Sequence, residues 1–233
     1  MSNPQAKRVR RIRPRLDSTL SEDALSRDEV VDDAVINHRH LVAVDLSGAR
    51  ARLVDFESCR FIRCTFSGGD LEKLSIVDTE LTGCDLANLR LDHGSFTRVE
   101  VLGCRLTGFV AAAAALRHVV FRDCTADFSS FRFDISVAIE FDECSLRQSD
   151  FASADLRGAT FRRCDLTGAE FSQARLGGAV FVDCTWDGIR GITSFAGATI
   201  ANSSPIDTLM FSAAMATGLG ILLGDPEDLL EID

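Results

Sequence analysis

Apolar residues recur at every fifth position of this chain from Leu41 to Trp186, and Ser136 is the one polar residue in that series. The residues two places before these positions are mostly small or apolar as well. A period of five matches neither the helical period of 3.6 nor the two-residue period of a plain strand. It predicts short sides of five residues, each with two inward side chains and a corner.

Cysteine spacing fixes the number of sides in each coil. Seven of the eight cysteines lie twenty residues apart: Cys64, Cys84, Cys104, Cys124, Cys144, Cys164 and Cys184. Because twenty is four fives, each cysteine then lies above the previous one in a four-sided coil. Coils stacked at the strand spacing of ~4.8 Å make about eight coils from residue 41 to 200, a rod roughly 38 Å long.

The segment "ADLRGATFRRCDLTGAEFSQARLGGAVF", residues 154–181, resembles the A(D/N)LXX pattern of pentapeptide repeat proteins. The resemblance covers about two-thirds of the chain. It implies a bacterial protein with an all-β solenoid fold, a right-handed quadrilateral β-helix. Some members of that family resemble a rod of DNA, bind DNA gyrase or topoisomerase IV and protect these enzymes from quinolones.

Three segments follow from this pattern: residues 1–40, the repeat rod 41–200, and residues 201–233. Ser26 and Glu29 form a possible capping box, which predicts a short helix near 21–35 over the first coil. Before it lies the basic arm "KRVRRIRPR", which we expect to remain mobile because nothing in it can be buried.

The C-terminal segment predicts a capping helix, because Ser204 and Pro205 supply an N-cap and a first helical residue. Its broad apolar surface comprises Ile206, Leu209, Met210, Ala213, Met215 and Leu219. Many members of the resembling family dimerise through a C-terminal helix, which implies a homodimer here. The uncharged run 209–223 is shorter than the ~20 residues of a membrane span, and no secretory signal begins the chain, so we expect a cytoplasmic location.

The cysteines allow three interpretations: a metal site, a redox chain or a structural ladder. A metal site needs several ligands that converge on one point, whereas a ladder places thiols one above another. Disulfides need Cβ atoms that point toward each other, and stacked strands keep them parallel. We therefore predict that the cysteines fill the core beside Phe121, Phe141, Phe161 and Phe181, without a metal or cofactor.

Catalytic motifs are missing from the sequence. No glycine-rich phosphate loop stands between a strand and a helix, and no GxSxG motif occurs. A coil filled to its axis with phenylalanine and leucine leaves no cleft for a substrate. The chain is therefore not expected to be an enzyme.

One region, residues 128–140, fits the repeat poorly. If the phase of five is kept, Asp134 and Ser136 face the core, while six apolar residues face outward: Val110, Ala112, Ala113, Phe133, Ile135 and Val137. Burying an unpaired carboxylate is costly, so we favour a corner that straightens or bulges. The alternative is an exposed apolar patch for a protein partner.

A DNA mimic needs an acidic surface, and the side that carries the cysteines is the best candidate. Its outward acids are Asp45, Asp85, Asp127, Asp165 and Asp187. Residues 41–200 hold 22 acidic and 17 basic groups, whereas B-DNA carries roughly 22 charges over ~38 Å. Two hypotheses stay open: a topoisomerase-binding DNA mimic, and an interaction scaffold that docks through the apolar patch or the basic arm. We expect no direct nucleic-acid binding by the rod.

Overall fold

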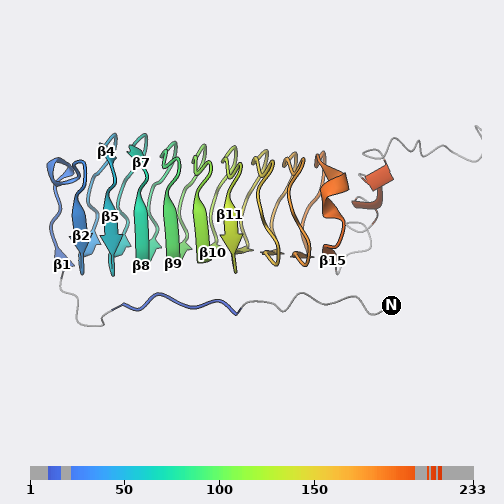
Figure 1. Ribbon diagram of the computed structural model, residues 1–233, viewed down its shortest axis with the longest axis horizontal. Helices are drawn as coiled ribbons and strands as arrows, with labels where there is room; N and C mark the ends of the chain where they lie inside the picture. Colours follow the sequence, from blue (N-terminus) through green and yellow to red (C-terminus); the bar gives the residue numbers. More distant parts are fainter. Residues whose placement is uncertain (1–9, 17–21, 203–208, 210, 214, 217–233) are drawn as a thin grey trace, which may run out of the picture.

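The computed structural model describes residues 10–16, 22–202, 209, 211–213 and 215–216. The chain winds into a straight rod of stacked coils with parallel strand pairing (Figure 1). The predicted fold is thereby confirmed: an all-β solenoid, a right-handed quadrilateral β-helix of about eight coils.

Short strands make up the coils. In chain order they are β1 (Glu22–Asp23), β2 (Val35–Asn37), β3 (His40–Val42), β4 (Arg50–Arg52), β5 (Asp55–Glu57), β6 (Arg60–Ile62), β7 (Asp70–Glu72), β8 (Ser75–Thr82), β9 (Ser95–Leu102), β10 (Ala115–Arg122), β11 (Ile135–Val137), β12 (Glu140–Asp142), β13 (Thr160–Arg162), β14 (Val180–Val182) and β15 (Thr199–Ala201). Two 3-10 helices, η1 (Arg27–Glu29) and η2 (Ile192–Phe195), lie near the ends.

We name the four sides by their inward residues. Side A carries Phe121, Phe141, Phe161 and Phe181; side B carries the seven ladder cysteines; side C carries Phe131, Phe151 and Phe171; side D carries Phe56, Ile76, Phe96 and Leu116. The register between neighbouring coils is twenty residues, as in the pairing of Phe121 with Phe141 and of Phe141 with Phe161. Residues twenty apart therefore lie directly above one another.

Left-handed backbone at every fifth residue makes the corners. At the corners between sides B and C, and at most of those between sides C and D, the N–H of residue i+3 donates to the C=O of residue i, as from Gly69 to Phe66 at 3.1 Å, around Gly68 at a φ of 66°. This is the positive φ that a type II turn needs at its third residue. The corner between sides D and A differs, because β8, β9 and β10 run through it at Asp78, Arg98 and His118.

Aromatic rings fill the axis of the C-terminal half. Side A rings stack in parallel, with centroids 5.0 Å apart for Phe121–Phe141 and 4.7 Å apart for Phe161–Phe181. Phe151 of side C packs edge to face against Phe141, 5.8 Å away. The absence of tyrosine fits this core, because a tyrosine hydroxyl buried among phenylalanine rings would need a hydrogen-bond partner.

Both ends of the rod carry irregular segments. At the N-terminal end, Ser26 and Glu29 form the predicted capping box, and the short helix expected near 21–35 is the 3-10 helix η1, three residues long. Leu25 and Val30 beside it are buried. Near the C-terminal end, η2 interrupts the coil before β15 pairs with β14.

Candidate interaction surfaces

The structure places all seven ladder cysteines, and also Cys59, in the core, and none forms a disulfide. Each ladder thiol donates to a carbonyl oxygen 23 residues earlier, as from Cys144 to Phe121 at 3.4 Å and from Cys164 to Phe141 at 3.5 Å. Burial raises the pKa of the Cys59 thiol, and hydrogen bonding to the Cys104 thiol together with burial raises the pKa of Cys84 to about 12. A thiol whose pKa is raised in this way is neutral at pH 7, and both side chains are shielded from solvent.

Asp134 lies inside the rod. Its side chain is 0% exposed, and one carboxyl oxygen, Oδ1, accepts from the N–H of Ala114 at 2.9 Å. Oδ2 and the hydroxyl oxygen of Ser136 are buried without a hydrogen-bond partner among the described residues. Burial raises the pKa of Asp134 to about 8. The side chain is therefore largely protonated at neutral pH, which lowers the cost of burying it.

The preferred interpretation of residues 128–140 was wrong, because this segment keeps the repeat phase. The N–H of Ile135 donates to Ala114 O at 2.9 Å, and that of Ser136 donates to Asp155 O at 3.0 Å. Neither a straightened corner nor a bulge occurs there. The prediction assumed an ionised side chain at Asp134. With its raised pKa, Asp134 is a neutral carboxylic acid, which costs less to bury in the core than a carboxylate does.

Because the phase is kept, apolar side chains point outward beside sides C and D. Phe133 and Ile135 are 54% and 58% exposed, and Phe128 at the preceding corner is 61% exposed. Val110, Ala112, Ala113 and Val137 are partly buried around them. The guanidinium of Arg132 lies 5.3 Å from the centre of the Phe133 ring. Phe128 and Phe133 lie at successive corners, and Ile135 begins the next strand; together we call these three residues the apolar corner.

The candidate acidic face on side B is partly neutralised. Asp85 pairs with Arg105 at 2.7 Å and Asp165 with Arg147 at 2.7 Å. The remaining three acids, Asp45, Asp127 and Asp187, form no ion pair among the described residues. The same arrangement recurs elsewhere on the rod, because arginine and carboxylate alternate twenty residues apart.

Asp142 forms ion pairs with two arginines. Arg122 and Arg163 both reach its carboxylate, at 3.3 Å and 2.6 Å. Charges in register on neighbouring coils therefore attract rather than repel. The rod presents a mixed surface, unlike the uniform charge of a nucleic-acid backbone.

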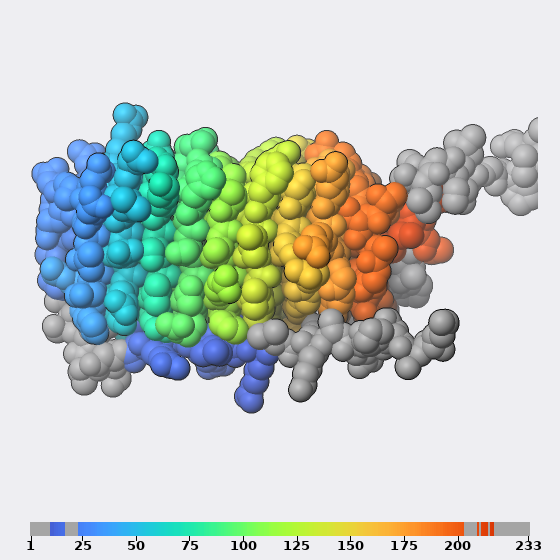
Figure 2. Space-filling model, in the orientation of Figure 1, coloured from blue at the N-terminus to red at the C-terminus, as the bar shows by residue number. Residues whose placement is uncertain are grey.

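The expectation of a mobile arm is wrong for residues 10–16, which lie along side A of the rod (Figure 2). Arg11 Nη1 is 2.7 Å from Glu100 Oε1, and the N–H of Arg15 donates to Asp78 Oδ1 at 3.0 Å. Sequence reasoning missed this contact, because the carboxylates that receive the arm are more than sixty residues away. The signal that could have found it was the outward column of acids on side A.

At the C-terminal end, residues 209, 211–213 and 215–216 are helical. The Phe211 ring contacts that of Trp186 with centroids 4.7 Å apart, and Met215 packs against the same core. Leu209 points away, at 68% exposed, and Ala213 is partly buried. Phe211 was missed in the sequence pattern. The other predicted helix residues, Ile206, Met210 and Leu219, lie outside the described residues.

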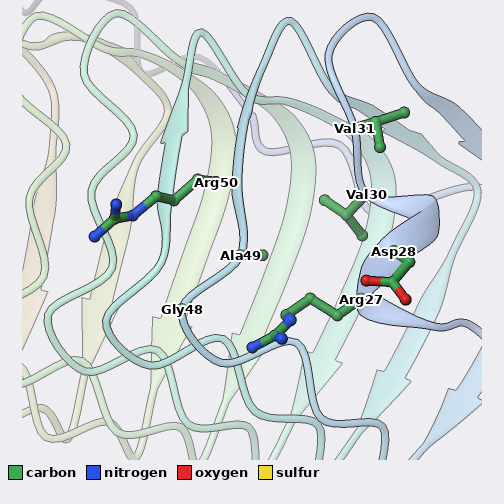
Figure 3. A pocket seen from close by; sticks show the side chains of 7 residues that line it. All are labelled: Arg27, Asp28, Val30, Val31, Gly48, Ala49 and Arg50. Atoms are coloured by element: carbon green, nitrogen blue, oxygen red, sulfur yellow. The ribbon is translucent and has the colours of Figure 1, made fainter.

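Pockets on the described surface are open and shallow. One of about 260 Å³ lies between η1 and β4, where Arg27, Asp28, Val30 and Arg50 line it (Figure 3). Another of about 320 Å³ lies between the arm and side A, lined by Arg10, Arg11, Glu140 and Arg162. Within the described ranges, no three histidine, cysteine or acidic side chains gather at one point, and no helix could cross a membrane.

Comparisons with known proteins agree with the repeat architecture. A family model for the pentapeptide repeat region matches residues 54–131 and 94–171. No curated protein sequence is significantly similar to the chain.

Solved structures of three proteins resemble the rod. HetL, a pentapeptide repeat protein involved in heterocyst differentiation regulation from the cyanobacterium Nostoc sp. strain PCC 7120, is 18% identical with a TM-score of 0.35, over 73% of this chain and 84% of HetL. A trypsin-treated variant of QnrB1, a plasmid-mediated fluoroquinolone resistance protein, is 23% identical with a TM-score of 0.35, over 82% and 90%. Rfr23 from the cyanobacterium Cyanothece 51142 is 12% identical with a TM-score of 0.21, over 54% and 85%. These identities and scores carry no information about partners.

Proposed function

The chain belongs to the pentapeptide repeat family, and from that premise we propose that it acts without catalysis, by binding a protein partner through the apolar corner. The observation that carries this proposal is the exposure of Phe128, Phe133 and Ile135. Aromatic and aliphatic side chains at the centre of an interface supply most of its binding energy. The axis beneath them is packed with buried phenylalanine and leucine side chains, so we place the interaction on the surface.

The local geometry supports a rigid docking surface. Phe133 is fixed at a corner with a φ of 60°, and Ile135 belongs to β11, which pairs with β10. Arg132 is anchored to Asp150 at 2.9 Å and leans over the Phe133 ring. Pre-organised apolar side chains with a charged neighbour cost little entropy on binding. The partner that fits is a protein with an apolar face and an adjacent carboxylate.

Photocrosslinking tests this proposal. A photoreactive phenylalanine at position 133 is expected to trap a defined protein in cells of the source organism, and the purified partner should bind the rod in a titration. Replacing Phe133 and Ile135 by serine is expected to weaken that binding at least about tenfold.

Leu53 supplies the matched control. It lies at the same corner, four coils away, and is 48% exposed, but it lacks neighbouring exposed aromatic residues. A photoreactive residue at 53 should trap no such partner. The proposal fails if both positions trap the same proteins, or if the serine variant binds the purified partner as well as the unaltered chain does.

A second candidate function is interaction with a type II topoisomerase through side B. The observation that favours it is that three outward carboxylates of side B, Asp45, Asp127 and Asp187, form no ion pair within the part of the chain that the structure describes. Together with the straight rod, these offer separated negative charges to a basic DNA-binding groove. Paired Asp85 and Asp165 lie between them and reduce the likeness to DNA.

A supercoiling assay separates the two candidates. DNA gyrase and topoisomerase IV are assayed with and without the protein over a range of quinolone concentrations. Inhibition or protection that is lost when Asp45, Asp127 and Asp187 become asparagine supports the mimic. If inhibition or protection is instead lost in the Phe133→Ser, Ile135→Ser variant, these enzymes bind the apolar corner. No effect at micromolar protein excludes these topoisomerases as partners.

The C-terminal helix and the buried thiols bear on assembly and location. We propose a homodimer in which the C-terminal helix meets its copy through Leu209, since Phe211 and Met215 already face the rod. A cytoplasmic location accords with eight buried thiols that form no disulfide.

A further inference from the structure

Three polar contacts involving two residues of the arm hold it on side A. Arg11 forms ion pairs with Glu100 and, at a longer distance, with Glu140, and the N–H of Arg15 donates to Asp78. Arg10, Ile12 and Arg13 are exposed. The blue N-terminal segment runs along the edge of the rod in Figure 2 and spans several coils. Such an attachment is weaker than the rod on which it rests.

The rod provides a built site for one of these arginines. Glu100, Val120 and Glu140 stand in register on β9, β10 and β12. Arg11 Nη1 lies 2.7 Å from Glu100 and its Nε lies 4.0 Å from Glu140, so the guanidinium spans Val120. Val120 occupies an outward position and yet is 1% exposed. We call these three residues the arginine cradle.

A second anchor lies at the corner between sides D and A. Arg98 grips Asp78 with Nε at 2.6 Å and Nη2 at 2.5 Å, which fixes the carboxylate that accepts from Arg15 N–H. Against the effect of burial, hydrogen bonds from Arg98 and Arg15 hold the pKa of Asp78 below its usual value. With the arm in place the carboxylate is therefore ionised, and it is paired with Arg98.

Spacing along the arm matches spacing along the rod. Four residues of extended chain from Arg11 to Arg15 span about 13 Å. Asp78 and the level of Val120 are two coils apart, roughly 10 Å. Pro14 between the anchors favours an extended backbone. The cradle and Asp78 therefore fit an extended segment in which an arginine precedes, by four residues, the residue whose N–H donates to Asp78.

Charge on side A is unbalanced without the arm. Glu80 and Glu100 are neighbours in register, and Arg60 reaches Glu80 at 3.8 Å. Glu140 also pairs with Arg162 at 2.7 Å. Among the described residues, Arg11 is the one cation in ion-pair contact with Glu100. An empty cradle thus leaves the Glu100 carboxylate without this cation beside an uncovered valine, a combination that fits a guanidinium better than an ammonium.

We propose that the arginine cradle, with Asp78 as second anchor, is a binding site for an extended, arginine-containing segment of a partner protein, and that residues 10–16 occupy it until that partner arrives. This site is separate from the apolar corner and does not depend on the function proposed for it. Because the arm is tethered, its effective concentration is high, and a partner segment must outcompete it.

The probe for this proposal is a fluorescent peptide of residues 6–17, titrated against the full-length chain. In an Arg11→Ala chain the arm cannot fill the cradle, so the labelled peptide is expected to bind saturably. The unaltered chain should bind it at least about tenfold more weakly, because its own arm competes. Arg13→Ala is the matched control: Arg13 is exposed on the same arm, and this chain should behave like the unaltered one.

Further variants separate a built site from general charge attraction. Adding Glu100→Gln and Glu140→Gln to the Arg11→Ala chain is expected to abolish peptide binding, while circular dichroism shows an unchanged fold. A peptide of the same composition in scrambled order should bind at least about tenfold more weakly than the native peptide.

Three results would overturn the proposal. One is equal binding by the Arg11→Ala, Arg13→Ala and unaltered chains, and another is equal binding of native and scrambled peptides. The third is no peptide binding together with equal binding of a single-stranded oligonucleotide by all three chains, which would make the arm a nucleic-acid tail.

Discussion

The thiol of Cys124 donates to the carbonyl oxygen of Val101, 3.4 Å away and one coil earlier. The same relationship recurs along side B and explains why a small side chain with a weak donor suits this position. Alanine would fill the space incompletely and lose the donor, whereas a charged side chain would enter a packed stack.

Substitution of Cys124 tests the ladder. Cys124→Ala is expected to lower the free energy of unfolding by about 1–2 kcal/mol, and Cys124→Asp to unfold the rod in part or entirely. Urea denaturation followed by circular dichroism measures both. The control is Thr125→Asp, since Thr125 is the exposed neighbour and its replacement should change stability by less than about 0.5 kcal/mol. Unaltered stability of Cys124→Asp would mean that the side chain does not face inward.

Phe151 tests the packing of the axis. Its ring stacks between Phe131, 5.2 Å away, and Phe171, 4.9 Å away. Phe151→Ala is expected to cost about 3–5 kcal/mol through lost contacts and a cavity, whereas Phe151→Leu should cost about 1–2 kcal/mol. Chemical denaturation measures the difference. Equal effects of both substitutions would contradict a close-packed axis.

Asp134 predicts an unusual pH dependence of stability. Burial raises its pKa to about 8 in the folded chain, against 3.8 ordinarily, so folding takes up a proton between these values. The free energy of unfolding should therefore fall as pH rises through this window, by up to about 1.4 kcal/mol per pH unit, and should level off above it.

Asp134→Asn isolates this contribution. The amide keeps an acceptor for Ala114 N–H but does not titrate, so the variant should be more stable than the unaltered chain at pH 7.5 and similar to it at pH 4. Denaturation at several pH values supplies the measurement. Parallel pH profiles for the two chains would show that the carboxyl group is not buried as an acid.

Leu209 tests the proposed homodimer. Because it is 68% exposed while Phe211 packs on Trp186, Leu209→Glu should separate the subunits without loosening the cap. Light scattering coupled to gel filtration is expected to show the mass of one chain for the variant and of two for the unaltered protein. If the unaltered protein is itself a monomer, the homodimer proposal is wrong and the helix only caps the rod.

The repeat itself could be predicted from the sequence, because inward residues every fifth position and cysteines every twentieth leave one arrangement of sides. Residues 128–140 could not, since the prediction treated Asp134 as a carboxylate. Its protonation depends on burial, which depends on the coil already being formed. The outward column of acids on side A indicates a basic partner, but the individual partners of the arm could not be predicted, because a single arginine does not reveal which outward carboxylate it meets.

The phase of residues 128–140 is the central claim, since it puts Asp134 inside and Phe133 and Ile135 outside. Amide hydrogen exchange across this segment tests it most directly. We expect Ile135 and Ser136 N–H, bonded to Ala114 O and Asp155 O, to exchange as slowly as Asp155 N–H, which is bonded to Asp134 O at 2.8 Å. Exchange of Ile135 and Ser136 at the rate of an unstructured chain would contradict the account, because a straightened or bulged corner would leave both amides unpaired.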